Sequence, residues 1–122
     1  MPARPPQTEH VRAKCAAFHP SVVESVATAI QEHAVVVVGM AVNPHCKRAR
    51  RALDAAGVPH HYLELGGYHN MWRPRLALKM WSGWPTFPQV FVHGTLIGGA
   101  DQTQHMLRSG ELQAILERGE AA

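Results

Sequence analysis

The run of four valines from Val35 to Val38 constrains the fold of this chain more than any other stretch. A continuous β-branched segment that ends at a glycine, here Gly39, predicts a strand buried on both faces of a sheet. Such a strand is found where helices cover both sides of the sheet. The run therefore predicts an α/β fold built around this strand.

Helical and strand patterns alternate on either side of the valine run. Ser21 is a candidate N-cap for a helix over 21–32, with Glu24 completing a capping box. Asn43 is a candidate N-cap for a helix over 44–56, which Gly57 ends. The other predicted elements are a strand over 60–65, a helix over 74–81, a hairpin of strands over 89–92 and 95–97, a helix from Asp101 to Arg108, and a last helix that includes Leu112 and Leu116. This order predicts one α/β domain, with a central four-stranded mixed sheet flanked by helices.

The composition is that of a globular domain with a short N-terminal extension. The chain has 122 residues, of which 46% are hydrophobic, and this fits a single domain. Residues 1–16 are rich in proline and polar side chains, so we expect a flexible extension there and the domain over 17–122. No apolar run approaches the length of a membrane span, and no secretory signal is visible. The lack of such a run leads us to expect no membrane partner. Two cysteines are too few for a disulfide scaffold, so we expect a cytoplasmic protein.

The charged and metal-ligating side chains do not form a motif of their own. The net charge is +3, and no nucleic-acid-binding motif accompanies the basic residues within 47–51. We therefore expect a solvated helix face there and no nucleic-acid partner. The adjacent His60 and His61 would point to opposite faces of a strand. Because the sequence has no H-x-x-x-H or C-x-x-C motif, no metal site is expected.

Residues 84–101, with the sequence WPTFPQVFVHGTLIGGAD, form the most specific stretch of the chain. Together with RLALKMWSGWP over 75–85, this stretch resembles the W-P-T-F-P-Q and G-G-x-D motifs of monothiol glutaredoxins, which belong to the thioredoxin superfamily. The resemblance extends from Val35 to about Leu116. It implies a thioredoxin-like fold, a site for glutathione, and redox chemistry with a protein thiol or disulfide as partner.

The same resemblance implies which residues contact two parts of glutathione. Pro88 is expected to follow a cis peptide bond, which turns the backbone N–H and C=O of Phe87 toward the cysteine part of the tripeptide. Gly99, Ala100 and Asp101 would hold the γ-glutamyl end, through backbone N–H groups at a helix start and through a carboxylate. Asp101 is at the same time a candidate for a plain helix N-cap.

Two cations are expected at the opposite end of glutathione. Arg75 falls where monothiol glutaredoxins place an arginine near the glycine carboxylate, a group that a guanidinium grips bidentately. Lys79 lies one helical turn further on and is the weaker candidate. Met40 stands where many glutaredoxins have a lysine for this carboxylate, which leaves Arg75 to hold it.

The loop before the helix over 44–56 departs from the family pattern. Its spacing from the valine run and to Gly57 places Cys46 at the second, resolving cysteine of a C-P-Y-C-K-R loop. Asn43 then occupies the nucleophile position, where a helix start normally activates a thiolate. An alternative register places Cys46 at the nucleophile position and breaks the spacing of the following helix by three residues. Cys46 is the single thiol of the loop in either register, and therefore the candidate catalytic residue.

Three functions stay open on these grounds. A glutathione-dependent thiol-disulfide oxidoreductase would use Cys46 alone, whereas a glutathione-binding or interaction module would keep the fold without its nucleophile. An iron–sulfur carrier would bridge two subunits through one cysteine and one glutathione from each. Asn43 argues against the carrier, because an amide replaces the usual thiolate ligand. Cys15, in the extension, is expected to be a free thiol, with pairing to Cys46 as the alternative.

Overall fold

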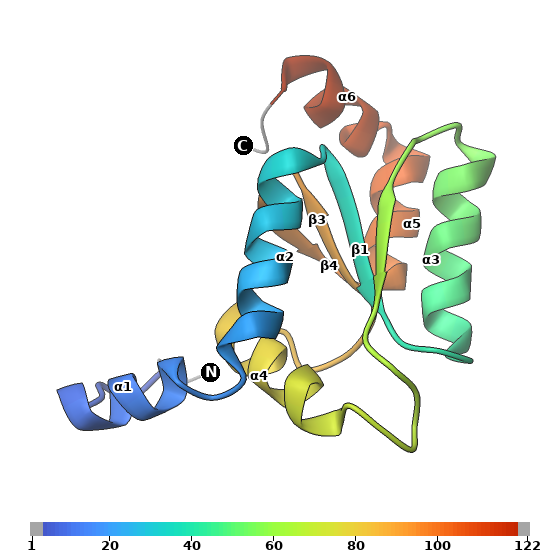
Figure 1. Ribbon diagram of the computed structural model, residues 1–122. Coiled ribbons are helices and arrows are strands. Elements are labelled where there is room, and N and C mark those ends of the chain that lie inside the picture. Colours follow the sequence, from blue (N-terminus) through green and yellow to red (C-terminus); the bar gives the residue numbers. More distant parts are fainter. Residues whose placement is uncertain (1–3, 120–122) are drawn as a thin grey trace.

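The computed structural model describes residues 4–119 and forms an α/β fold (Figure 1). Its elements are α1 (Glu9–Ala16), α2 (Pro20–Glu32), β1 (Val35–Gly39), α3 (Pro44–Ala55), β2 (His61–Glu64), α4 (Trp72–Ser82), β3 (Gln89–Val92), β4 (Thr95–Gly98), α5 (Ala100–Ser109) and α6 (Glu111–Arg118). Every element predicted from residue 21 onward is present, and those predicted with bounds have their ends within two residues of the prediction. The predicted fold class is therefore confirmed.

The sheet has four strands in the order β2-β1-β3-β4. Strand β1 pairs parallel with β2 and antiparallel with β3, and β3 pairs antiparallel with β4. The parallel pair is joined through α3, because parallel strands need a crossover connection. The central place of β1 explains why all five of its residues are buried.

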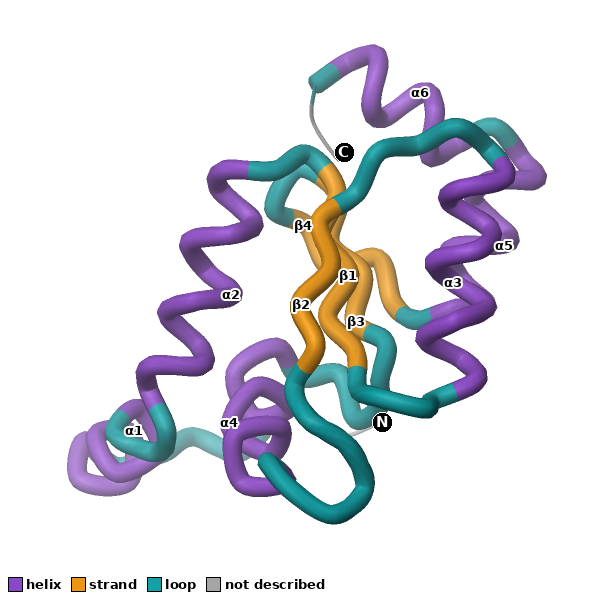
Figure 2. The backbone as a smooth tube through the Cα atoms, turned by 45° about the vertical axis from the view of Figure 1, so that its right-hand side comes forward, coloured by secondary structure: helices purple, strands orange, loops and turns teal. Residues whose placement is uncertain are grey.

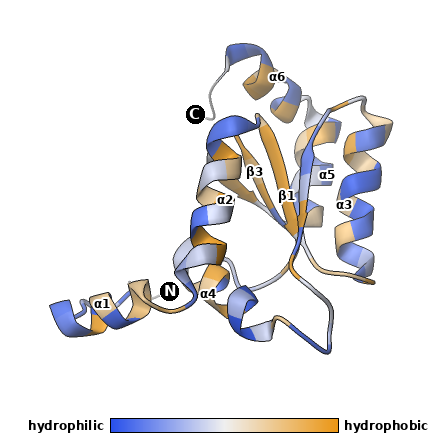
Figure 3. Ribbon diagram, in the orientation of Figure 1, coloured by the Kyte–Doolittle hydropathy of each residue, from blue (hydrophilic) through white to orange (hydrophobic). Residues whose placement is uncertain are grey.

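Helices cover both faces of the sheet, and the valines of β1 alternate between the two layers. Figure 2 shows α2 and α4 on one side, and α3, α5 and α6 on the other. Val36 and Val38 pack in the cluster with α2 and α4, whereas Val35 and Val37 pack in the cluster with α3 and α6. In Figure 3 the hydrophobic residues concentrate on β1 and β3, while hydrophilic residues mark the helices around them.

The N-terminal part differs from the sequence analysis in two respects. Residues 9–16 form α1, which was not predicted. Figure 1 shows α1 extending away from the rest of the molecule, at the end where α4 lies. The predicted N-cap Ser21 is wrong: α2 begins at Pro20 after His19, whose φ is 45°, and His19 makes no side-chain cap bond. Proline suits the first helical position, so the N-cap lies two residues earlier, at His19, and Ser21 lies inside the helix.

Candidate functional site

A cleft of about 240 Å³ lies where the starts of α3 and α5 meet the segment before β3. It is lined by His45, Arg48, Trp84, Thr86, Phe87, Pro88, Gly99, Ala100, Asp101 and Gln102. Five of these residues were expected from the sequence to contact a ligand: Phe87, Pro88, Gly99, Ala100 and Asp101. Two segments that are distant in sequence therefore meet in the cleft. The peptide bond between Phe87 and Pro88 is cis.

The start of α5 presents backbone N–H groups to the cleft. Gly99 is the N-cap, and its own N–H donates to Oε1 of Gln102 at 3.0 Å. The predicted N-cap Asp101 is therefore wrong: it lies in the first turn, because the glycine two residues earlier already provides the helix start. The N–H groups of Ala100 and Asp101 have no intrahelical acceptor, as in the first turn of any helix. This end of α5 can therefore bind an anion.

The glycine at position 99 permits a close approach of the two cleft walls. A β-carbon at Gly99 would lie 3.3 Å from the backbone oxygen of Pro88 and 3.6 Å from Nε1 of Trp84. That indole nitrogen is buried and has no hydrogen-bond partner among the described residues. A buried donor beside a cleft is available to an acceptor on a ligand.

Arg48 and Asp101 form an ion pair across the cleft. Their Nη1 and Oδ1 atoms are 2.6 Å apart, and the same Nη1 is 2.8 Å from Oε1 of Gln104. The other terminal nitrogen of Arg48 is 3.1 Å from Nδ1 of His45. The hydrogen bond from Arg48 lowers the pKa of Asp101, with its positive charge as a second cause, so this carboxylate stays ionised down to acid pH.

The sequence analysis did not identify Arg48 and His45 as site residues. The side chain of Arg48 stays 37% exposed, as expected for a solvated face, and the packing of α3 against α5 directs its guanidinium to Asp101. The available signal was their separation of three residues at the start of one helix, which places both side chains on one face. The partner, 53 residues away, could not be inferred from that spacing.

The two predicted cations, Arg75 and Lys79, do not line this cleft. Arg75 is only 7% exposed, and its Nη1 donates to the backbone oxygens of Leu65 at 2.8 Å and Asn70 at 2.7 Å. Its guanidinium therefore holds the segment between β2 and α4. Lys79 is half-buried, with its Nζ 5.6 Å from the centre of the Phe87 ring. Lys79 thus lies near the residue before Pro88 without lining the cleft.

Asn43 caps α3, as predicted. Its Oδ1 accepts from the backbone N–H of His45 at 2.9 Å and of Cys46 at 3.0 Å. Its Nδ2 lies 3.5 Å from the hydroxyl of Tyr68, which belongs to the segment after β2. The side chain of Asn43 is therefore used to start the helix.

Cys46 lies beneath the surface, in contact with the sheet. It is 1% exposed and belongs to the core cluster formed with α2 and α4. A β-carbon at Gly39 would lie 2.8 Å from Sγ of Cys46 and 2.9 Å from the hydroxyl of Tyr62. The thiol therefore occupies the space that a glycine in β1 leaves open. It is not presented to solvent at the helix start.

The reactivity of Cys46 follows from this burial. Desolvation raises the pKa of the Cys46 thiol, and the backbone of Met40 and the charge of Arg50 oppose the shift only in part. At neutral pH the thiol is protonated, and the thiolate is the reactive form. Both cysteines are free, and Cys15 lines a separate cavity, so pairing of the two is not observed.

We expect Cys46 to react with iodoacetamide at least about 10 times more slowly than Cys15 in the native protein at neutral pH. Burial of Cys46 keeps the reagent from its sulfur and lowers the fraction of the thiol that is ionised. The rates are measured by mass spectrometry of the two cysteine peptides over time. In urea the two rates should become equal, which is the control for peptide detection. Equal rates in the native protein would contradict the buried position of Cys46.

Within residues 4–119, no group of three or more His, Cys, Asp or Glu side chains is arranged to hold a metal ion. In the same range, no helix has the length and apolar character needed to cross a membrane.

Comparison with known proteins gives one consistent family. The glutaredoxin family model matches residues 35–97, which include Asn43, Cys46 and Pro88. A glutaredoxin-like protein of Dictyostelium discoideum is 46% identical over 106 residues, which cover 87% of this chain and 86% of that protein. A probable monothiol glutaredoxin of Legionella pneumophila is 38% identical over 82 residues, covering 65% of this chain and 89% of that protein.

A solved structure of the same family has a similar fold. The crystal structure of wheat glutaredoxin matches with a TM-score of 0.70 and 27% sequence identity. The match covers 84% of this chain and 97% of the wheat chain. The likeness therefore extends over nearly the whole of that protein.

Proposed function

Because the chain belongs to the glutaredoxin family, we propose that it binds glutathione in the cleft between α3 and α5. The family assigns the protein to thiol redox chemistry. The proposal concerns the ligand, the residues that hold it and the part that Cys46 takes. One observation carries it: the cleft combines a helix N-terminus, a carboxylate and an unpaired backbone segment in one place.

The γ-glutamyl end of glutathione carries both a carboxylate and an ammonium group. The free N–H groups of Ala100 and Asp101 suit the carboxylate, because a helix start attracts anions. The ionised side chain of Asp101 suits the ammonium. Arg48, paired with Asp101 at 2.6 Å, supplies a positive charge next to the same carboxylate site. This pairing supports a site for a group that carries both charges.

The backbone of Phe87 suits the cysteine part of the ligand. Its N–H and C=O make no hydrogen bond with another backbone group of residues 4–119. An extended peptide can pair with such groups as an added strand. Trp84 adds a buried indole N–H to the same cleft, and this donor suits a peptide oxygen of the ligand.

Lys79 is the better candidate of the two cations for the glycine carboxylate. Its ammonium lies near the Phe87 ring and has no ion pair within the described part of the chain. Arg75, in contrast, uses one guanidinium nitrogen for two backbone oxygens. We therefore assign the carboxylate contact to Lys79 and a supporting role to Arg75.

We further propose that glutathione is bound without rapid attack by a protein thiol. Exchange requires a thiolate that reaches the sulfur of the bound disulfide. Cys46 is 1% exposed with a raised pKa, and Asn43 occupies the N-cap of α3. The observations favour the binding module over the Cys46-dependent oxidoreductase. An iron–sulfur cluster is not proposed, because the amide of Asn43 cannot replace a thiolate ligand.

The Asp101→Asn variant tests the ligand site by isothermal titration calorimetry with reduced glutathione. We expect a dissociation constant about 10 to 100 times higher than that of the native protein, because a charged hydrogen bond to the ammonium is lost. Asp54→Asn, at the exposed end of α3, is the matched control and should bind as the native chain does. The Cys46→Ser variant should also bind normally. Equal affinity of Asp101→Asn and the native protein would refute the assignment.

A further inference from the structure

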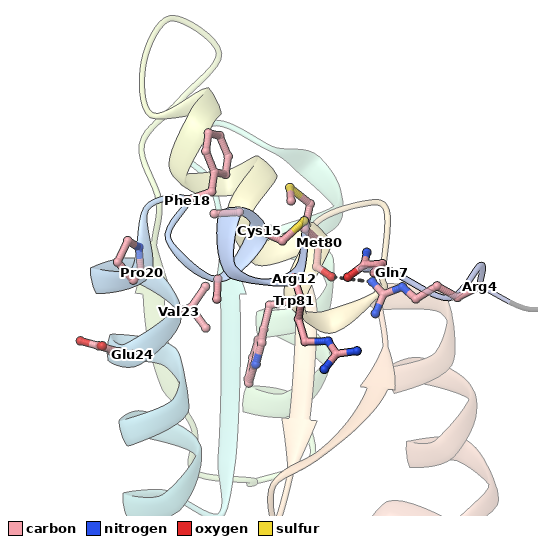
Figure 4. A pocket seen from close by; sticks show the side chains of 12 residues that line it. Arg4, Gln7, Arg12, Cys15, Phe18, Pro20, Val23, Glu24, Met80 and Trp81 are labelled. Atoms are coloured by element: carbon pink, nitrogen blue, oxygen red, sulfur yellow. Dashed lines mark hydrogen bonds between the residues drawn. The ribbon is translucent and has the colours of Figure 1, made fainter. Parts of the chain in front are cut away.

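A second cavity, of about 550 Å³, lies between α1, α2 and α4 (Figure 4). It is lined by Arg4, Gln7, Arg12, Cys15, Ala16, Phe18, Pro20, Val23, Glu24, Ala77, Met80 and Trp81. None of these residues lines the cleft proposed for glutathione. Its volume falls in the range of small-molecule sites, about 300–1,000 Å³. The cavity is therefore large enough for a ligand of its own.

The inner wall of this cavity is apolar. Trp81, Met80 and Ala77 come from α4, and Val23 comes from α2. The Trp81 ring packs against Phe91 of the core, with ring centres 6.4 Å apart, yet 44% of the residue remains exposed. An aromatic surface of this size is unfavourable in water and gains free energy when a ligand covers it.

The N-terminal segment adds positive charge to the same cavity. Nη2 of Arg4 donates to the backbone oxygen of Met80 at 3.0 Å, which ties this segment to the end of α4. Arg12 makes no hydrogen bond or ion pair with the side chains that the structure describes. Glu24, the single acidic side chain among the described residues of the lining, extends from α2 on the side opposite Arg4 and Arg12 (Figure 4). The cavity thus combines an apolar wall with two guanidinium groups on one side.

We propose that this cavity binds an amphipathic carboxylic acid, of the class of medium-chain fatty acids. Its carboxylate lies between the guanidinium groups of Arg4 and Arg12, where charge-assisted hydrogen bonds form. Its apolar chain covers the exposed face of Trp81. A small inorganic anion would satisfy the arginines and leave the apolar wall in water, whereas a neutral apolar molecule would give the two guanidinium groups no counter-charge.

Calorimetric titration of the full chain with monomeric decanoate tests this site. We expect saturable binding by the native protein and at least about 10-fold weaker binding by Arg12→Gln, which removes the charge on an exposed helix position. Arg108→Gln, at the exposed end of α5, is the matched control and should bind like the native protein. Decanol, which has the same tail without the charge, should bind at least about 10-fold more weakly than decanoate.

Cys15 provides a second readout, because its side chain lines the cavity. Saturating decanoate should slow the alkylation of Cys15 by iodoacetamide at least about 5-fold in the native protein, since a bound ligand blocks access. The Arg12→Gln variant should lose this protection at the same concentration. Glutathione affinity should be unchanged by Arg12→Gln, which separates this site from the cleft. No binding of decanoate, equal binding by Arg12→Gln, or equal binding of decanol would overturn the proposal.

Discussion

Replacing Asn43 with cysteine is expected to raise the glutathione-dependent reduction of a mixed disulfide by at least about 100-fold in kcat/KM. The new thiol would stand at the N-cap of α3, next to the N–H groups of His45 and Cys46 that now donate to Asn43. These groups and the helix dipole lower the pKa of a thiol at such a position. The rate is measured with a glutathionylated peptide in a coupled assay.

The matched control for this experiment is Asn43→Ser. Serine keeps an oxygen for the helix cap without a thiol, so the activity should stay at the native level. Asn43→Cys loses the cap and should be less stable by about 1 kcal/mol, which urea unfolding checks. If Asn43→Cys gives no gain in activity although it binds glutathione, the cleft does not hold the ligand within reach of the helix start.

Replacing Arg75 with methionine is expected to lower the free energy of unfolding by about 2–4 kcal/mol. The guanidinium is nearly fully buried and binds the backbone oxygens of Leu65 and Asn70. Methionine fills part of the space and leaves both oxygens without their donor. Urea unfolding followed by tryptophan fluorescence measures the loss.

A second measurement separates this structural role from a direct contact with glutathione. Under conditions where Arg75→Met is still folded, its affinity for glutathione should lie within about 3-fold of the native value, since Lys79 is assigned to the carboxylate. Lys79→Met should show the reverse pattern, with normal stability and about 10-fold weaker binding. Weak binding by Arg75→Met with unchanged stability would restore the role that the family resemblance implies for Arg75.

Local sequence patterns predicted most of the fold because they report short-range physics. Four β-branched residues in a row required burial on both faces, and β1 lies inside the sheet with its valines in two core clusters. Asn43 followed by Pro44 predicted the start of α3, since both act through bonds and angles within one turn. The N-caps Ser21 and Asp101 were wrong because a neighbouring residue, Pro20 or Gly99, starts the helix first.

The candidate cleft was predicted in part, through the family motifs. Those motifs named Phe87, Pro88, Gly99, Ala100 and Asp101, and the structure brings them together. They did not include Arg48, because its role depends on how α3 packs against α5. The flexible character of residues 1–16 stays a prediction, although α1 forms within them.

The sequence by itself determined the central strand, the start of α3 and the absence of a thiol at that start, because each depends on residue type within a few positions. Only the tertiary structure decided that Cys46 is buried against Gly39, that Arg48 pairs with Asp101, and that Arg75 is enclosed by backbone oxygens. Each of these depends on a distance between segments that are remote in sequence. The packing of helices on the sheet sets these distances. It thereby also sets the charge of the cleft and the reactivity of Cys46.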